Sequence, residues 1–177
     1  MARRKRGNPV NGWVIVDKPS DITSTQVVGI VRRVFDAAKA GHAGTLDPIA
    51  TGILPVALGE ATKTIPYVMD ATKDYWFDLR WGEARTTDDI EGDVTETSDL
   101  RPEQAEIEAA LGAFLGELVQ VPPQFSAVKI DGQRAYDLAR DGETFEIKSR
   151  VVHVERFDLA EVVDRDTARF RVRSGKG

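Results

Sequence analysis

The residues of this chain best suited to chemistry lie in a glycine-rich segment around position 47. The sequence GHAGTLDPIATGILPVALGEATK spans Gly41–Lys63, and its first part places His42 and then Asp47 ahead of Pro48. A residue before proline is disfavoured in a helix, so the Asp47 carboxylate is predicted to stand on a stiff, extended loop. An ionised carboxylate can act as a nucleophile or as a base. The same residues also fit a simple turn former and a structural histidine.

Tyr75 and Lys18 are the other two candidates for a functional site. Tyr75 begins an alternating apolar series, in which it could serve only as one inward-facing residue of a strand. Lys18 ends a short β-branched run and precedes Pro19. Taken alone, its ammonium group could simply be solvated.

The elements that must position these residues follow from the spacing of apolar side chains. Alternation predicts strands and a spacing of three to four residues predicts helices. The order mixes both without a regular βαβ rhythm, which predicts an α+β fold with a mixed, largely antiparallel sheet flanked by helices. The predicted elements are strands at 12–17, 53–58, 74–82, 125–130, 144–148, 151–163 and 167–173, helices at 23–37, 103–115 (opened by Pro102) and 133–140, helical spacing at 60–69, and loops at 39–52 and 86–100.

The charge of the chain is unevenly distributed. Its 177 residues carry a net charge of −5 with a pI near 5.1, which by itself argues against a nucleic-acid-binding protein. Residues 78–117, however, hold twelve acidic residues against three arginines, a net charge of −9. The rest of the chain is therefore basic, and residues 1–42 alone carry +5. The mean charge is a poor guide to what the protein contacts.

The composition also excludes several kinds of chemistry. The chain has no cysteine, which removes disulfides, thiolate metal sites and thiol catalysis. A reducing compartment is the simpler reading. No apolar run approaches the length of a membrane span, and the basic start of the chain lacks the apolar part of a secretory signal. We therefore expect a cytoplasmic protein.

Four motifs, in order along the chain, resemble those of the bacterial tRNA pseudouridine synthase B (TruB) family. The glycine-rich segment is similar to the family's G-H-x-G-x-L-D-P-x-A-T-G-x-L-P core, and VDKPSDITS to D-K-P-x-G-x-[ST]-S. KDYWFDLRWGEARTTDDIEGD resembles K-x-Y-x-x-x-x-x-x-G-x-x-T-D-T-x-D-x-x-G. PPQFSAVKIDGQRAYDLARDGE resembles P-x-x-[YF]-S-A-x-K-x-x-G-x-x-x-Y-x-x-A-R-x-G. The first motif is highly specific, and the occurrence of all four in the same order makes the probability of a chance resemblance very small.

The resemblance implies a pseudouridine synthase fold and an isomerase. It implies that the protein, like members of the TruB family, converts uridine-55 in the T loop of tRNA to pseudouridine, without a metal, a redox cofactor or a nucleotide triphosphate. The implied partner is the T-arm stem-loop of tRNA, with no membrane and no obligate protein partner. We expect the basic residues 1–42 to border this RNA and the acidic segment 78–117 to lie mostly away from it. A tRNA-binding or tRNA-folding module without chemistry remains an alternative.

The resemblance also implies roles for the four candidate residues. Asp47 matches the catalytic aspartate, which could attack the sugar, add to the base or abstract a ribose proton. Tyr75 matches an active-site tyrosine whose ring can stack on the extruded uracil. His42 matches a histidine that helps to occupy the space left when loop bases flip out, since the target atom is otherwise stacked inside the loop. Lys18 would support the site or meet phosphate.

Two features depart from the family pattern. Asp21 stands where the family usually has glycine, which questions how tight the turn between Lys18 and Ser24 can be. The family's arginine partner of the catalytic aspartate follows a K-G-x-[YF] motif, whereas this sequence reads SGKG up to Gly177. We therefore expect residues 1–177 to be an incomplete catalytic domain, without its last strands and a C-terminal RNA-binding PUA domain, and inactive as an isolated polypeptide.

Overall fold

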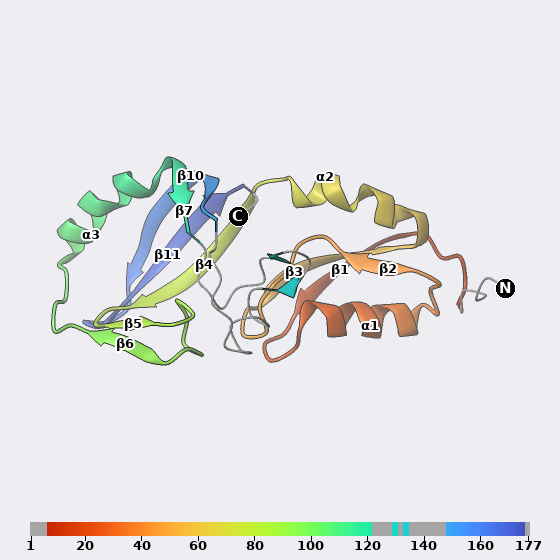
Figure 1. The fold of residues 1–177 in the computed structure, drawn as a ribbon, viewed down its shortest axis with the longest axis horizontal. Helices are drawn as coiled ribbons and strands as arrows, with labels where there is room; N and C mark the ends of the chain where they lie inside the picture. The colour runs from red at the N-terminus through yellow and green to blue at the C-terminus, as the bar shows by residue number, and fades with distance from the viewer. Residues whose placement is uncertain (1–6, 122–128, 131–132, 135–147, 176–177) are drawn as a thin grey trace. The chain divides into compact units, whose positions relative to one another are not determined.

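The chain forms two compact units, Met1–Ala71 and Thr72–Gly177 (Figure 1). The computed structural model describes residues 7–121, 129–130, 133–134 and 148–175. Helices and antiparallel strand pairs occur together in it, which confirms the predicted α+β class with largely antiparallel pairing. The described strands divide into several sheets rather than the one sheet that was expected.

The first unit is built on a three-stranded antiparallel sheet in the order β1–β3–β2. Figure 1 shows α1 on one side of this sheet and η1 with α2 on the other. The elements are β1 (Gly12–Lys18), α1 (Ser24–Val34), β2 (Ala40–His42), β3 (Gly52–Leu58), the 3-10 helix η1 (Gly59–Thr64) and α2 (Ile65–Met69). The predicted strands and the first helix are confirmed, while β2 is a short strand inside the predicted loop.

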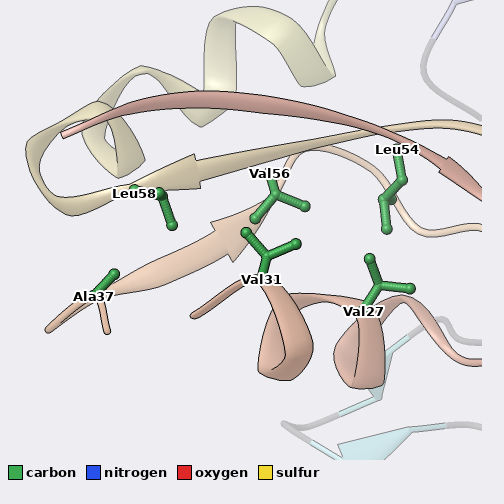
Figure 2. Close-up of a cluster of buried hydrophobic side chains, with 6 residues drawn as sticks. All are labelled: Val27, Val31, Ala37, Leu54, Val56 and Leu58. Atoms are coloured by element: carbon green, nitrogen blue, oxygen red, sulfur yellow. The ribbon is translucent and has the colours of Figure 1, made fainter. Parts of the chain in front are cut away.

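One apolar core joins α1 to the sheet, as Figure 2 shows. Val27 and Val31, about one turn apart, point from α1 toward Leu54 and Val56 of β3. Burial of each such side chain contributes about 1.5–3 kcal/mol. Because side chains alternate along a strand, every second residue of β1 also faces this core, and Lys18 is the last of that row.

A capping box fixes where α1 begins. The Thr23 hydroxyl accepts a hydrogen bond from the Gln26 backbone N–H over 3.1 Å, and the Gln26 side chain accepts one from the Thr23 N–H over 2.8 Å. The helix ends before the predicted residue 37, because Asp36 adopts a positive φ of 44°. Ser24 is therefore the first helical residue, at the end of the sheet where β1 stops.

The second unit is built on a four-stranded antiparallel sheet in the order β4–β11–β10–β7. The elements are β4 (Lys73–Arg80), α3 (Gln104–Leu111), the 3-10 helix η2 (Gly112–Phe114), β7 (Gly116–Gln120), β10 (Arg150–Val162) and β11 (Thr167–Ser174). Ile107 of α3 packs against Ala168 and Phe170 of β11. The ring of Phe77 stacks on that of Phe170, and the ring of Trp81 meets it edge-on, which extends this core.

Two small hairpins complete the described part of the chain. Residues 86–100, expected to be a loop, include β6 (Val94–Thr97), which pairs with β5 (Glu83–Arg85). The second hairpin pairs β8 (Lys129–Ile130) with β9 (Gln133–Arg134), so the helix predicted from 133 is wrong at its first two residues, and its remainder lies outside the described residues. The predicted strand at 144–148 also falls almost entirely outside them.

Candidate functional site

Lys18 and His42 each end a strand that flanks β3. β1 and β2 are both antiparallel to β3, but β2 reaches only the middle of β3, four residues short of the β3 residue that lies opposite Lys18. Lys18 pairs with Gly52 and His42 with Val56, which puts both side chains on the face that packs on α1. The loop from His42 to Gly52 carries Asp47 and leads to the β3 residue opposite Lys18, so three of the four predicted site residues belong to the first unit.

Lys18 is fully buried, with an exposed fraction of 0%. Its ammonium group donates hydrogen bonds to the carbonyl oxygens of Pro19 at 2.9 Å, Ile22 at 2.8 Å and Pro48 at 3.1 Å. An ammonium group has three hydrogens, so these three acceptors use all of them. The structure therefore excludes the solvated alternative for Lys18 and gives its side chain a supporting position behind the loop.

The carbonyl oxygen of Pro48 is held from a second direction. It accepts a hydrogen bond from the backbone N–H of Asp21 over 2.8 Å. Asp21 reaches this position with a φ of 65°, in the left-handed region that glycine adopts most easily. The turn after Lys18 therefore forms with Asp21 in the left-handed conformation, which would explain the glycine that the resembled motif has at this position.

The residue before Asp47 is held by Ser24. The Ser24 hydroxyl donates to the Leu46 carbonyl oxygen and accepts from the Leu46 N–H, each over 3.0 Å. Asp47 itself accepts a hydrogen bond from the Ala50 N–H through its carbonyl oxygen, over 3.1 Å, which forms a tight turn. Both neighbours of Asp47 are consequently fixed by the connection between β1 and α1.

The Asp47 side chain is exposed on this fixed loop. Among the residues that the structure describes, none forms an ion pair with it. Its carboxylate is thus presented outward from a backbone anchored on either side. Such an arrangement suits a group that must reach a substrate without moving its own main chain.

The His42 ring is oriented by its own loop. Its Nδ1 lies 2.5 Å from the carbonyl oxygen of Gly44. A carbonyl oxygen can only accept, so Nδ1 is the protonated nitrogen in this contact. Gly44 has a φ of 104°, which turns that carbonyl back toward the ring. Between His42 and Gly44, the backbone N–H of Ala43 donates to the Pro55 carbonyl oxygen over 2.9 Å and ties the loop to β3.

Tyr75 belongs to the second unit. It lies on β4 opposite Val172 of β11, and its side chain is 39% exposed. Partial burial raises the pKa of the Tyr75 phenol above its ordinary value, so the hydroxyl stays neutral at physiological pH. The Tyr75 ring is thus partly exposed on β4, and its stacking on a base stays a prediction.

Sequence reasoning did not include Ser24 or Asp21 among the site residues. Both lie in VDKPSDITS, but their contacts with the Asp47 loop join positions far apart in the chain: Ser24 and Leu46 are 22 residues apart. The signal that could have identified the buried Lys18 was the alternation of β1, which places it on the same face as Val14 and Val16.

The chain matches known proteins along almost its whole length. Residues 32–177 match the model of the TruB family pseudouridylate synthase N-terminal domain. The tRNA pseudouridine synthase B of Gluconacetobacter diazotrophicus is 60% identical over 175 residues, and that of Brucella anthropi is 58% identical over 179. These matches cover 99% and 100% of this chain but 57% and 55% of the relatives, so the chain spans little more than half their length.

Solved structures share the fold. A Cbf5–Nop10–Gar1 complex contains a chain with a TM-score of 0.69 and 29% identity, which covers 94% of this chain and 40% of its own. An H/ACA ribonucleoprotein bound to a substrate RNA matches in fold, with a TM-score of 0.65. Among the helices of the described residues, none has the length and apolar character to cross a membrane. On the match over residues 32–177, this chain belongs to the TruB family of pseudouridylate synthases.

Proposed function

We propose that this protein is a tRNA pseudouridine synthase that isomerises uridine-55 in the T loop of tRNA. The observation that carries the proposal is the exposed Asp47 carboxylate on a loop anchored at both neighbouring residues. The family match supports the reaction class, and the relatives named tRNA pseudouridine synthase B support tRNA as the substrate. We also propose that residues 1–177 belong to one catalytic domain.

The reaction is an isomerisation, and its atoms balance within the nucleoside. The bond between N1 of uracil and C1′ of the ribose breaks, and a bond between C5 and C1′ forms. C5 loses its proton and N1 gains one, so uridine and pseudouridine have the same composition. A carboxylate such as Asp47 can begin this sequence by attacking C1′, by adding to the base or by removing a ribose proton.

The other three residues act around Asp47 in this proposal. Tyr75 stacks on the extruded uracil, and its hydroxyl is neutral. His42, held by Gly44, helps to fill the space that the flipped bases leave. Lys18, predicted to support the site or meet phosphate, acts through the loop, because its three hydrogens are already used by carbonyl oxygens.

The RNA partner follows from the same proposal. The protein would recognise the T arm mainly by shape and by its flipped bases rather than by duplex sequence. The basic residues 1–42 would border the phosphates, and the acidic segment 78–117 would lie mostly away from them. Binding should weaken as salt rises, because Lys and Arg side chains displace counterions from the RNA. The absence of cysteine fits work in the reducing cytoplasm.

The experiment uses the full product of the gene that encodes this chain. The protein is incubated with an unmodified tRNA transcript, and pseudouridine is located by mass spectrometry of nuclease fragments. We expect one pseudouridine, at position 55, and no product from a transcript with cytidine there. Pseudouridine at another position would contradict the proposed site, and its absence from every tRNA would contradict the proposed activity.

A further inference from the structure

The hydroxyl of Ser24 is almost completely withdrawn from solvent. The residue is 2% exposed and is one of the two buried polar or charged residues in the described part of the chain, the other being Lys18. The Ser24 oxygen makes two hydrogen bonds to one partner, Leu46, donating to its carbonyl oxygen and accepting from its N–H. A hydroxyl is a small side-chain group that can do both at once.

This pair of hydrogen bonds fixes two peptide planes. The Leu46 N–H belongs to the peptide that enters Leu46, and its carbonyl belongs to the peptide that leads into Asp47. Ser24 therefore sets the direction in which the chain arrives at Asp47. Without the hydroxyl, a partly buried donor and acceptor would both lose their partner, which is costly to the folded conformation of the loop.

Ser24 is itself held on a rigid element. It is the first residue of α1, directly after the Thr23 cap, and α1 is anchored to the sheet through Val27 and Val31. Thr23 already caps the helix, so the Ser24 hydroxyl is not needed for that purpose and is committed to Leu46. The core of the first unit is thereby connected to the backbone next to Asp47.

We propose that Ser24 is a positioning residue for Asp47, an inference that rests on the proposed synthase activity. Lys18 and Asp21 fix the carbonyl that follows Asp47, and Ser24 fixes the residue that precedes it. Removal of one anchor lets the carboxylate drift. A displacement of about 1 Å at a reacting group can cost on the order of 100-fold in rate.

The test combines kinetics with amide hydrogen exchange in the full gene product. Ser24→Ala removes both hydrogen bonds, and Ser24→Cys keeps a side chain of similar shape with a much weaker donor and acceptor. The matched control is Thr25→Ala, which removes an exposed hydroxyl from the next position of the same helix. We expect Ser24→Ala to lower kcat about 10- to 100-fold with KM for tRNA within about threefold, and Ser24→Cys to fall between it and the wild type.

Exchange of the Leu46 amide supplies the second measurement, because Ser24 is the acceptor of that N–H. It should quicken at least about tenfold in Ser24→Ala and stay unchanged in Thr25→Ala. Unchanged Leu46 exchange, unchanged kcat, or a rise in KM alone would each overturn the proposal. If Ser24→Ala does not fold, Ser24→Cys decides by the same criteria. A wild-type protein that forms no pseudouridine would contradict the synthase activity instead, and the exchange rates would still test the Ser24 contact.

Discussion

The ammonium group of Lys18 donates a hydrogen bond to the carbonyl oxygen of Pro48 over 3.1 Å, which ties the end of β1 to the residue after Asp47. Two more carbonyl oxygens share the same buried group. A charge withdrawn from water is tolerated only when such partners surround it. The Lys18 side chain therefore acts as a structural support of the loop.

Replacement of Lys18 by methionine should destabilise the protein. The methionine keeps most of the apolar stem but leaves three carbonyl oxygens without their donor, so we expect a loss of about 2–4 kcal/mol in the free energy of unfolding. Urea denaturation of the full gene product measures it. Lys39→Met, at an exposed lysine of the same unit, is the control and should change stability by less than about 0.5 kcal/mol. Equal effects of the two substitutions would mean that the buried contacts of Lys18 contribute nothing.

Asp21→Gly should stabilise the protein. Asp21 has a φ of 65°, and a left-handed conformation costs most residues about 1–2 kcal/mol that glycine does not lose. Glycine gains flexibility in the unfolded chain, so the net increase should be at most about 1 kcal/mol. Asp21→Val is the matched opposite and should lower stability by about 1 kcal/mol or more, because a β-branched residue fits this conformation poorly. A destabilised Asp21→Gly protein would show that the aspartate side chain itself supports the turn.

Gly44→Ala should act through His42. Alanine disfavours the φ of 104° at Gly44, so the carbonyl that accepts from the His42 ring should turn away. We expect Gly44→Ala and His42→Ala each to lower kcat for tRNA, and the double substitution to be little worse than either alone. A double-mutant cycle measures this coupling. Fully additive effects would indicate that Gly44 and His42 act independently.

Asp74 should give the second unit a pH-dependent stability. A side-chain hydrogen bond from Arg173 lowers the pKa of Asp74 below its ordinary value, and Arg171 adds to this. A carboxyl group with a lowered pKa in the folded state stabilises the protein above its unfolded pKa. That stability is lost as the pH falls through the folded pKa.

Titration of the Asp74 carboxyl by NMR should therefore give a pKa below the ordinary value for aspartate, and added salt should reduce the difference, because the pair is exposed. In unfolding measurements between pH 6 and pH 3, Asp74→Asn should weaken the pH dependence. Asp99→Asn, at an exposed residue of the same unit, should leave it as in the wild type. A normal Asp74 pKa would mean that the ion pairs with Arg171 and Arg173 do not persist in solution.

The elements with strong periodicity could be predicted from sequence, and the short ones could not. β4 alternates clearly in sequence, β1 and β3 are short β-branched or apolar runs, and the bounds of these strands and of the last two agree with the prediction within a few residues. β2 has three residues in a glycine-rich stretch, and the β5–β6 hairpin lies among acidic residues, so neither shows a periodic pattern. Both depend on pairing with a partner strand, which local spacing does not encode.

The start of a helix likewise depends on contacts that the spacing of apolar residues does not reveal. Pro102 was predicted to stand in the first turn of α3, but Glu103 forms the cap, so Pro102 precedes the helix. The box between Glu103 and Glu106 decides the start. In the site, the motifs identified Asp47 and His42, whereas the contact between Ser24 and Leu46 exists only once α1 has packed on the sheet.

The catalytic role of Asp47 is tested by comparing the wild-type gene product with Asp47→Asn on a T-arm stem-loop. Pseudouridine is quantified by mass spectrometry, and the dissociation constant for the RNA is measured in parallel. Asparagine keeps the shape of the side chain and removes its charge, so we expect product formation to fall at least about 1,000-fold, with RNA affinity within about threefold of the wild type. Asp99→Asn should retain full activity. Normal product formation by Asp47→Asn would contradict the central claim, and a wild type that binds the stem-loop without modifying it would point to a tRNA-binding module instead.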